Sequence, residues 1–175
     1  MGREYKDIAG AVLKDVAEFM CAAARTAPKA KGVDNLVITI LDEADKQKVI
    51  QAMEKLAAKD KSRPGMVRDA KNIKKIDHII VIGTEKSPLG LNCGFCGYPT
   101  CEELSKTNGV CSYSALNLGI ALGSAVSIAS KFHIDNRMMY SIGKAAMESG
   151  VLGKTVSMAV GIPLSATGKN PFFDR

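Results

Sequence analysis

Three short segments of β-branched and apolar residues alternate along the chain with longer segments of helical periodicity. The β-branched composition predicts strands at residues 35–41, 76–84 and 154–163. Apolar residues at helical spacing predict helices at residues 4–25, 45–59, 114–132 and about 136–149. Strands separated by helices are typical of a layered α/β domain. With 175 residues, 46% of them hydrophobic, the chain can bury one sizeable core, so we expect a single domain over residues 1–175.

The charge of the chain limits its partners. A net charge of +6 is spread along the sequence without a long basic run, and aromatic residues make up only 5% of the chain. We therefore expect no nucleic-acid binding, and the positive charge favours a small anionic ligand or an acidic protein partner. Residues 1–7 are polar and charged, and no window reaches roughly 18 uninterrupted apolar residues. We accordingly expect a cytoplasmic protein without a membrane segment.

A cysteine-rich segment interrupts the alternation between the second predicted strand and the long helix that follows it. The sequence CGFCGYPTC, with one further cysteine ten residues later, supplies Cys93, Cys96, Cys101 and Cys111. In a reducing compartment, clustered cysteines are more often metal ligands or redox groups than structural disulfides. We predict that residues 86–113, called the cysteine segment below, form an inserted metal-binding loop.

The composition of this segment favours an iron-sulfur cluster. Three thiolates within nine residues can wrap one side of a compact inorganic core, and Cys111 can close it from the start of the next helix. Gly94 and Gly97 each follow a cysteine, and glycine permits the positive φ that turns backbone N–H groups toward charged sulfurs. Four bound thiolates would leave no open iron position, which favours outer-sphere electron transfer.

Other uses of these cysteines remain open. A four-cysteine zinc site usually shows two separated CxxC motifs, whereas this sequence has one CxxC followed by wider gaps. A thioredoxin-like CxxC would begin a helix without two more cysteines nearby. The fifth cysteine, Cys21, lies in the apolar part of the first predicted helix, and we interpret it as a packed core residue.

The cysteine motif resembles known cluster-binding sequences. CGFCGYPTC followed by a further cysteine is similar to the 4Fe-4S motif CGxCGxxxC…C of the corrinoid iron-sulfur protein large subunit and of the Rnf B subunit. The longer stretches TAPKAKG, DNRMMYSIGKAA and GIPLSATGKNPFFDR resemble an uncharacterised family of ferredoxin-domain proteins found largely in anaerobes. This resemblance covers essentially the full chain and implies a redox protein holding one 4Fe-4S cluster.

The flanking regions resemble a second family. AAARTAPKAKGVDNLVITILD and VSMAVGIPLS are similar to two segments of nitroreductases. That resemblance implies a nitroreductase-like α/β domain, which carries FMN at the interface of a homodimer. The chain departs from the nitroreductase pattern because the N-terminal Arg-Arg-Ser segment is missing, Lys29 replaces serine and Gly32 replaces asparagine. The resemblance therefore implies an altered flavin site.

Basic residues near both ends are candidates for a phosphate site. If the domain closes as the nitroreductase resemblance implies, the strand at 35–41 and the strand ending at Pro163 would lie side by side. Arg and Lys side chains suit phosphate contacts, so an anion pocket for FMN would then form from Arg25, Lys29, Lys31, Lys169 and Arg175.

The long predicted helix also suggests an oligomer. Gly119, Gly123 and Ser127 are spaced four apart, which permits close contact between helices. Together with the nitroreductase resemblance, this spacing predicts a homodimer.

We therefore expect an iron-sulfur protein that functions in electron transfer with a redox partner that the motif does not specify. The first alternative is an FMN-dependent oxidoreductase fed by the cluster. The second is an interaction protein with a structural zinc site.

Overall fold

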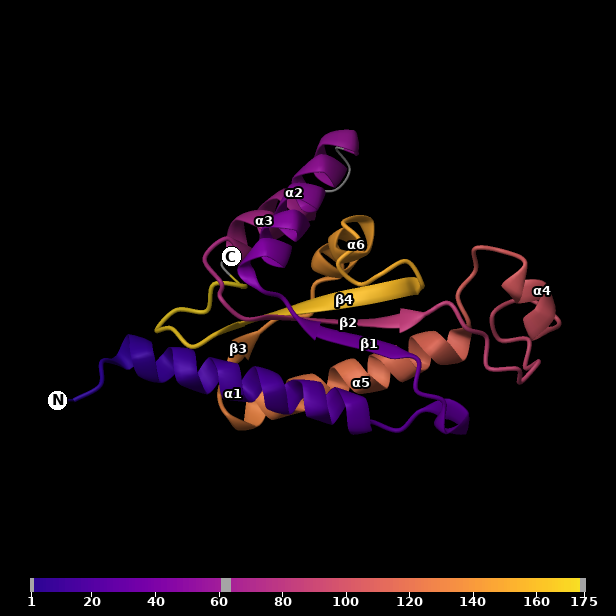
Figure 1. Ribbon diagram of the computed structural model, residues 1–175, viewed down its shortest axis with the longest axis horizontal. Helices are drawn as coiled ribbons and strands as arrows, with labels where there is room; N and C mark the ends of the chain where they lie inside the picture. The colour runs from indigo at the N-terminus through magenta and orange to yellow at the C-terminus, as the bar shows by residue number, and fades with distance from the viewer. Residues whose placement is uncertain (1, 61–63, 174–175) are drawn as a thin grey trace.

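The fold is a four-stranded antiparallel sheet covered by helices on both faces (Figure 1). The computed structural model describes residues 2–60 and 64–173. The strands lie in the order β1 (Leu36–Ile40), β2 (Ile79–Glu85), β4 (Val156–Ser165) and β3 (Asp135–Asn136). One face is covered by α1 (Tyr5–Thr26) and α5 (Ser112–Lys131), which lie side by side, and the other by α2 (Glu43–Lys59), α3 (Pro64–Ile73) and α6 (Tyr140–Glu148).

The sheet separates two hydrophobic cores. Along β2, Ile80 and Ile82 pack with α1 and α5, whereas Ile79 and Val81 pack with α2, α3 and α6. Successive side chains of a strand point to opposite faces, so a strand covered on both faces is apolar throughout. This explains why residues 76–84 are almost uninterrupted in hydrophobicity, and it places β2 in the centre of the sheet.

The predicted elements are confirmed with small shifts in their ends, and several elements were not predicted. The structure adds α3, the two-residue strand β3, the short helix α4 (Cys101–Ser105) and a turn of 3-10 helix at Ala30–Gly32. Residues 61–63, between α2 and α3, lie outside the described residues.

The predicted neighbourhood of β1 and β4 is wrong, because β2 lies between them and pairs with both. The physical reason is the burial of β2. It is the most apolar strand and is covered on both faces, so it takes the central position.

Helix α6 approaches β4 unusually closely. A side chain at Gly143 of α6 would overlap the backbone carbonyl group of Ala159 in β4. Gly161 of the same strand lies against Ile142 in a similar way. Glycine is therefore required at both positions for the helix to sit on the sheet.

Helix α5 combines a length and an apolar composition that would also suit a membrane-spanning helix. In the structure it packs beside α1 on the sheet, where Leu118, Ala121, Leu122 and Ala125 are buried. This packing accounts for the buried face of the helix, whereas Leu116 and Ile120 on its outer face are exposed.

Candidate metal centre

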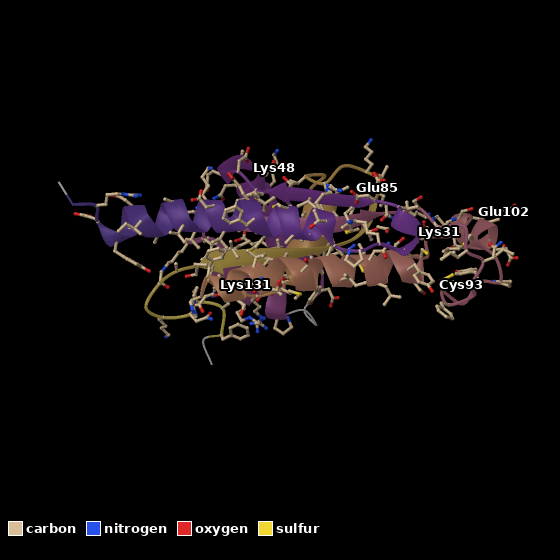
Figure 2. All side chains as sticks on the ribbon, turned by 90° about the horizontal axis from the view of Figure 1, so that it is seen from below. Lys31, Lys48, Glu85, Cys93, Glu102 and Lys131 are labelled. Atoms are coloured by element: carbon tan, nitrogen blue, oxygen red, sulfur yellow. The ribbon has the colours of Figure 1, made fainter. Side chains whose placement is uncertain are left out.

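The cysteine segment extends beyond one end of the sheet. It leaves the end of β2, contains α4, and enters the first turn of α5 (Figure 1). Figure 2 shows Cys93 and Glu102 at this tip, with Lys31 beside them and Lys131 far along α5. The segment has a small core of its own, formed by Leu89, Leu104 and Cys111. It is therefore a distinct lobe on the edge of the domain.

All four cysteines of the segment line one hollow. Cys93 is exposed, Cys96 and Cys101 are half-buried, and Cys111 is buried. The walls between them are Leu89, Leu91, Asn92, Gly94, Tyr98, Thr100, Ser112 and Tyr113. The arrangement brings together residues up to eighteen positions apart in sequence, which is the separation of Cys93 from Cys111. The sulfurs thus run from the surface toward the interior.

Backbone turns hold the first three cysteines around the hollow. Gly94 and Gly97 have φ angles of 73° and 85°, in the left-handed region that favours glycine. The N–H of Gly97 donates to the carbonyl of Gly94 at 2.9 Å, closing the turn that contains Cys96. Replacing either glycine with a larger residue would strain this turn.

Asn92 connects the start of this turn to α4. Its backbone N–H donates to the sulfur of Cys101 at 3.4 Å, and its side-chain oxygen accepts the N–H of Cys101 at 2.8 Å. Asn92 itself has a positive φ of 47°, a conformation that asparagine tolerates better than most residues. The sequence reasoning overlooked Asn92, although an asparagine directly before a cysteine in a glycine-rich loop is a signal for such a turn.

The environment of Cys111 favours its thiolate form. Burial raises the pKa of this thiol, but the backbone N–H groups of Ser114, Leu89 and Tyr113 and the hydroxyl of Ser114 outweigh that effect, so its pKa lies below the ordinary value. Cys111 occupies the N-cap position of α5, where unpaired N–H groups favour negative charge.

Cys21 lies in the opposite kind of environment. It packs among apolar residues between α1 and α5, and burial together with the nearby Glu18 raises the pKa of its thiol to about 11, against a smaller opposing effect of Arg25. This thiol is protonated at neutral pH. Its position agrees with the interpretation of Cys21 as a packing residue.

The four cysteines of the hollow can be compared with the ligands of two kinds of metal centre. In a tetrahedral zinc site with Zn–S bonds of about 2.3 Å, the sulfurs lie only about 3.8 Å apart. Within residues 2–60 and 64–173, no three His, Cys, Asp or Glu side chains gather closely enough to hold one metal ion. A four-iron cluster instead binds one thiolate at each iron, which requires sulfurs spread around a larger core. The donor set and its N–H groups fit such a cluster.

The basic residues at the end of α1 are engaged within the chain. Arg25 pairs with Asp34 at 2.8 Å and also donates to the carbonyl of Leu36. The buried ammonium group of Lys29 donates to the carbonyls of Arg25 and Ala27. These contacts complete the C-terminus of α1 and hold the chain as it turns toward β1.

Lys31 reaches the cysteine segment rather than its neighbours in sequence. Its ammonium group donates to the carbonyl of Leu89 at 3.0 Å, and its backbone has a positive φ of 58°. Lys31 thus connects the turn after α1 to the wall of the hollow. Arg25 and Lys29 both pair with the carboxylate of Asp34, at 2.8 and 3.9 Å, whereas Lys31 contacts Leu89 instead.

Lys169 lies near the opposite end of α1, so one chain does not assemble the predicted anion pocket. It lines a hollow of about 980 Å³ together with Lys6, Lys71 and Lys75. The hollow is lined by α1 residues only as far as Leu13, so roughly 18 Å of helix separates it from Arg25. Arg175 lies outside the described residues.

Two comparisons place the chain among known sequences. Residues 107–175, which include Cys111, match the family described as uncharacterized protein containing a ferredoxin domain (DUF2148). An uncharacterized protein of Archaeoglobus fulgidus is 39% identical over 179 residues, covering 97% of this chain and 95% of that protein. The chain belongs to this ferredoxin-domain family. The predicted family resemblance is therefore confirmed.

Solved structures show which fold this ferredoxin-domain protein shares. A nitroreductase with bound FMN from Desulfitobacterium hafniense has a TM-score of 0.62 at 15% identity, covering 89% of this chain and 78% of that one. A nitroreductase-like family protein from Bacillus cereus has a TM-score of 0.58 at 12% identity, covering 90% and 76%. The nitroreductase-like fold predicted from the flanking segments is confirmed. That the cysteine segment is an insertion into this fold stays a prediction.

Proposed function

We propose that this ferredoxin-domain protein binds one 4Fe-4S cluster through Cys93, Cys96, Cys101 and Cys111 and transfers electrons. The observation that carries the proposal is that all four cysteines line one hollow whose backbone supplies N–H groups to the sulfurs. A cluster held there would supply one-electron transfer between a low-potential protein or flavin donor and an acceptor, with no bond formed or broken. The membership in a ferredoxin-domain family supports this function.

The inner and outer sides of the hollow have different roles in the proposed function. Leu89 and Tyr98 form an apolar wall that limits water on the inner side, where Cys111 is buried. Cys93 is exposed at the tip, and this side therefore faces an electron donor or acceptor. Solvent exposure and hydrogen bonds to sulfur both set the potential of such a centre.

Anaerobic reconstitution tests the proposal. Purified chain incubated with ferrous iron and sulfide should retain about four irons and four sulfides per chain after desalting, with broad visible absorption that bleaches on reduction. Retention of zinc in preference to iron, without visible absorption, would favour the structural four-cysteine site instead.

A second candidate function is an FMN-dependent reductase, and it rests on a different part of the molecule. The hollow beside the start of α1 has a volume of about 980 Å³, which lies in the range of volumes of small-molecule sites. Four lysines line it. Lysine ammonium groups suit a phosphate as point charges. A flavin held here would lie at the opposite end of α1 from the cysteine segment, so a reductase would need a second chain to bring the two together.

Titration with FMN tests this candidate. We expect flavin fluorescence to be quenched with an affinity in the micromolar to millimolar range, because Lys29 and Gly32 depart from the nitroreductase pattern. The double variant Lys6→Ala with Lys75→Ala should weaken binding, whereas Lys106→Ala in the cysteine segment should not. If FMN concentrations up to about a millimolar cause no quenching, any binding is worth less than about 4 kcal/mol. That outcome would exclude the reductase and leave electron transfer as the proposed function.

We also expect a homodimer through the outer faces of α1 and α5. Phe19 of α1, Leu116 and Ile120 of α5 are exposed, and Phe19 stacks on the exposed Phe132 with ring centroids 6.2 Å apart. Leu116 and Ile120 are one turn apart on α5 and form an exposed apolar patch, which favours contact with another chain. Light scattering should report twice the 18.6 kDa chain mass, and Leu116→Glu should shift the mass toward one chain. A single-chain mass for the unmodified protein at micromolar concentration would exclude the dimer.

A further inference from the structure

A buried polar column runs inward from Cys111. Cys111, Ser114 and Asn117 follow one another at spacings of three residues, so they lie on the same side of the first turns of α5. All three are buried, and Ser114 and Asn117 are only 1% and 2% exposed. The polar residues face the ends of β1 and β2 instead of solvent. In the following turns of α5, the buried positions are occupied by apolar residues such as Ala121 and Ala125.

Residues from the sheet complete the column. The side-chain amide of Asn35 donates to the hydroxyl of Ser114 at 3.3 Å, and the side-chain oxygen of Asn117 accepts the N–H of Ala30 at 3.0 Å. Thr84 lies beside Asn35, because the register pairs Thr84 with Leu36. Thr84 is fully buried in β2. The column therefore joins α5 to the turn before β1 and to the end of β2.

Three polar atoms in this column have no partner among the residues that the structure describes. They are the side-chain oxygen of Asn35, the hydroxyl of Thr84 and the side-chain nitrogen of Asn117. Buried polar atoms without partners cost stability, and an apolar set of the same size would avoid that cost. A cluster of such atoms behind one cysteine is consistent with a role in the site that outweighs this cost.

Ser114 is placed to act on Cys111. Cys111 is the N-cap of α5 and Ser114 is the third residue of the helix, so both side chains lie on the same side of the first turn, where each can approach the backbone N–H of the other. Because Ser114 accepts a hydrogen bond from Asn35, its own hydrogen is available for donation. The competing acceptor, the carbonyl of Ser87, lies at a long 3.4 Å. A donation from Ser114 to the sulfur would join Asn35, Ser114 and Cys111 in a chain in which each donor strengthens the next.

We propose that Asn35 and Ser114 form a hydrogen-bond relay that donates to the sulfur of Cys111 and raises the reduction potential of the cluster held there. The inference rests on the proposed function of the four cysteines. A hydrogen bond to a ligand sulfur stabilises the more negatively charged reduced state, so it shifts the potential upward. Both residues act through Cys111 and are positioning residues.

The test compares Ser114→Ala with Ser141→Ala. Ser141 is also fully buried and donates to Asp69 at 2.5 Å, but it lies in α6 on the other side of the sheet. Midpoint potentials are measured anaerobically by titrating the reconstituted proteins with low-potential viologen dyes as one-electron reductants. S114A should change the ratio of oxidised to reduced protein about tenfold at a fixed potential, a negative shift of about 59 mV. S141A should lose stability and keep the potential of the unmodified protein.

A second variant decides the matter if S114A fails to fold. Asn35→Leu removes the donor to Ser114 and should shift the potential in the same direction. An unchanged potential in S114A or in N35L, or equal shifts in S114A and S141A, would overturn the relay. If the unmodified protein itself holds no cluster, the proposed function fails first, and that outcome is visible before any variant is compared.

Discussion

Serine in place of Cys93, Cys96, Cys101 or Cys111 should lower the iron retained after reconstitution, whereas Cys21→Ser should leave it unchanged. Removing a ligand should cost more affinity than removing a second-shell partner, which typically costs 10-fold to 100-fold. Cys111→Ser should have the largest effect, because Cys111 is buried and stabilised as a thiolate by neighbouring N–H groups. The measurement is iron and sulfide per chain, supported by visible absorption.

Exposure gives this series an internal control. Cys93 is exposed at the tip, so an added small thiol such as 2-mercaptoethanol can take the vacated ligand position in C93S and restore absorption. The same thiol should not rescue C111S, because that position is buried. Full iron retention by C111S would remove Cys111 from the site, and iron loss in C21S would contradict the assignment of Cys21 as a packing residue.

Gly143→Ala should lower the free energy of unfolding by more than about 3 kcal/mol, at the upper end of what overpacking usually costs. The added methyl group would overlap the backbone of Ala159, and backbone in the middle of a sheet cannot move aside as a flexible side chain can. Helix α6 would have to lift from β4, which would expose Ile142 and Ala145 in one of the two cores. Urea denaturation followed by circular dichroism measures the change.

Gly10→Ala in α1 is the matched control. A methyl group there would meet no atom within 4 Å, and alanine is a better helix former than glycine, so stability should rise by up to about 1 kcal/mol. Equal stability of G143A and the unmodified protein would mean that α6 does not sit on β4 as closely as described.

The main elements of the fold followed from hydrophobic patterning, and the elements that did not follow had specific causes. Helix α3 begins at Pro64 within a polar segment that resembles a connector, although proline suits the first position of a helix. Helix α4 has only five residues, too few for a periodic signal. The strand order depends on pairing between segments that are distant in sequence, and no local sequence pattern predicts such pairing.

The candidate site was predictable to the extent that it is local. Cys93, Cys96 and Cys101 are close in sequence and must be close in space, whereas Cys111 joins them only because α5 starts beside the end of β2. The pairing of Arg25 with Asp34 could not be read from composition, and it removes Arg25 from the predicted anion pocket. The Asn35 and Ser114 contact spans 79 positions and leaves no motif.

The small separate core of the cysteine segment has a consequence for how the protein opens. Leu89, Leu104 and Cys111 pack with one another and not with either of the two large cores. Cooperative unfolding units tend to follow such divisions, and the unit with the fewest apolar contacts opens at the lowest free energy. We therefore expect loss of a bound metal centre to unfold this lobe locally while the sheet and the helices that cover it stay folded. Assembly of such a centre would then be a late, local and reversible step on a domain that has already folded.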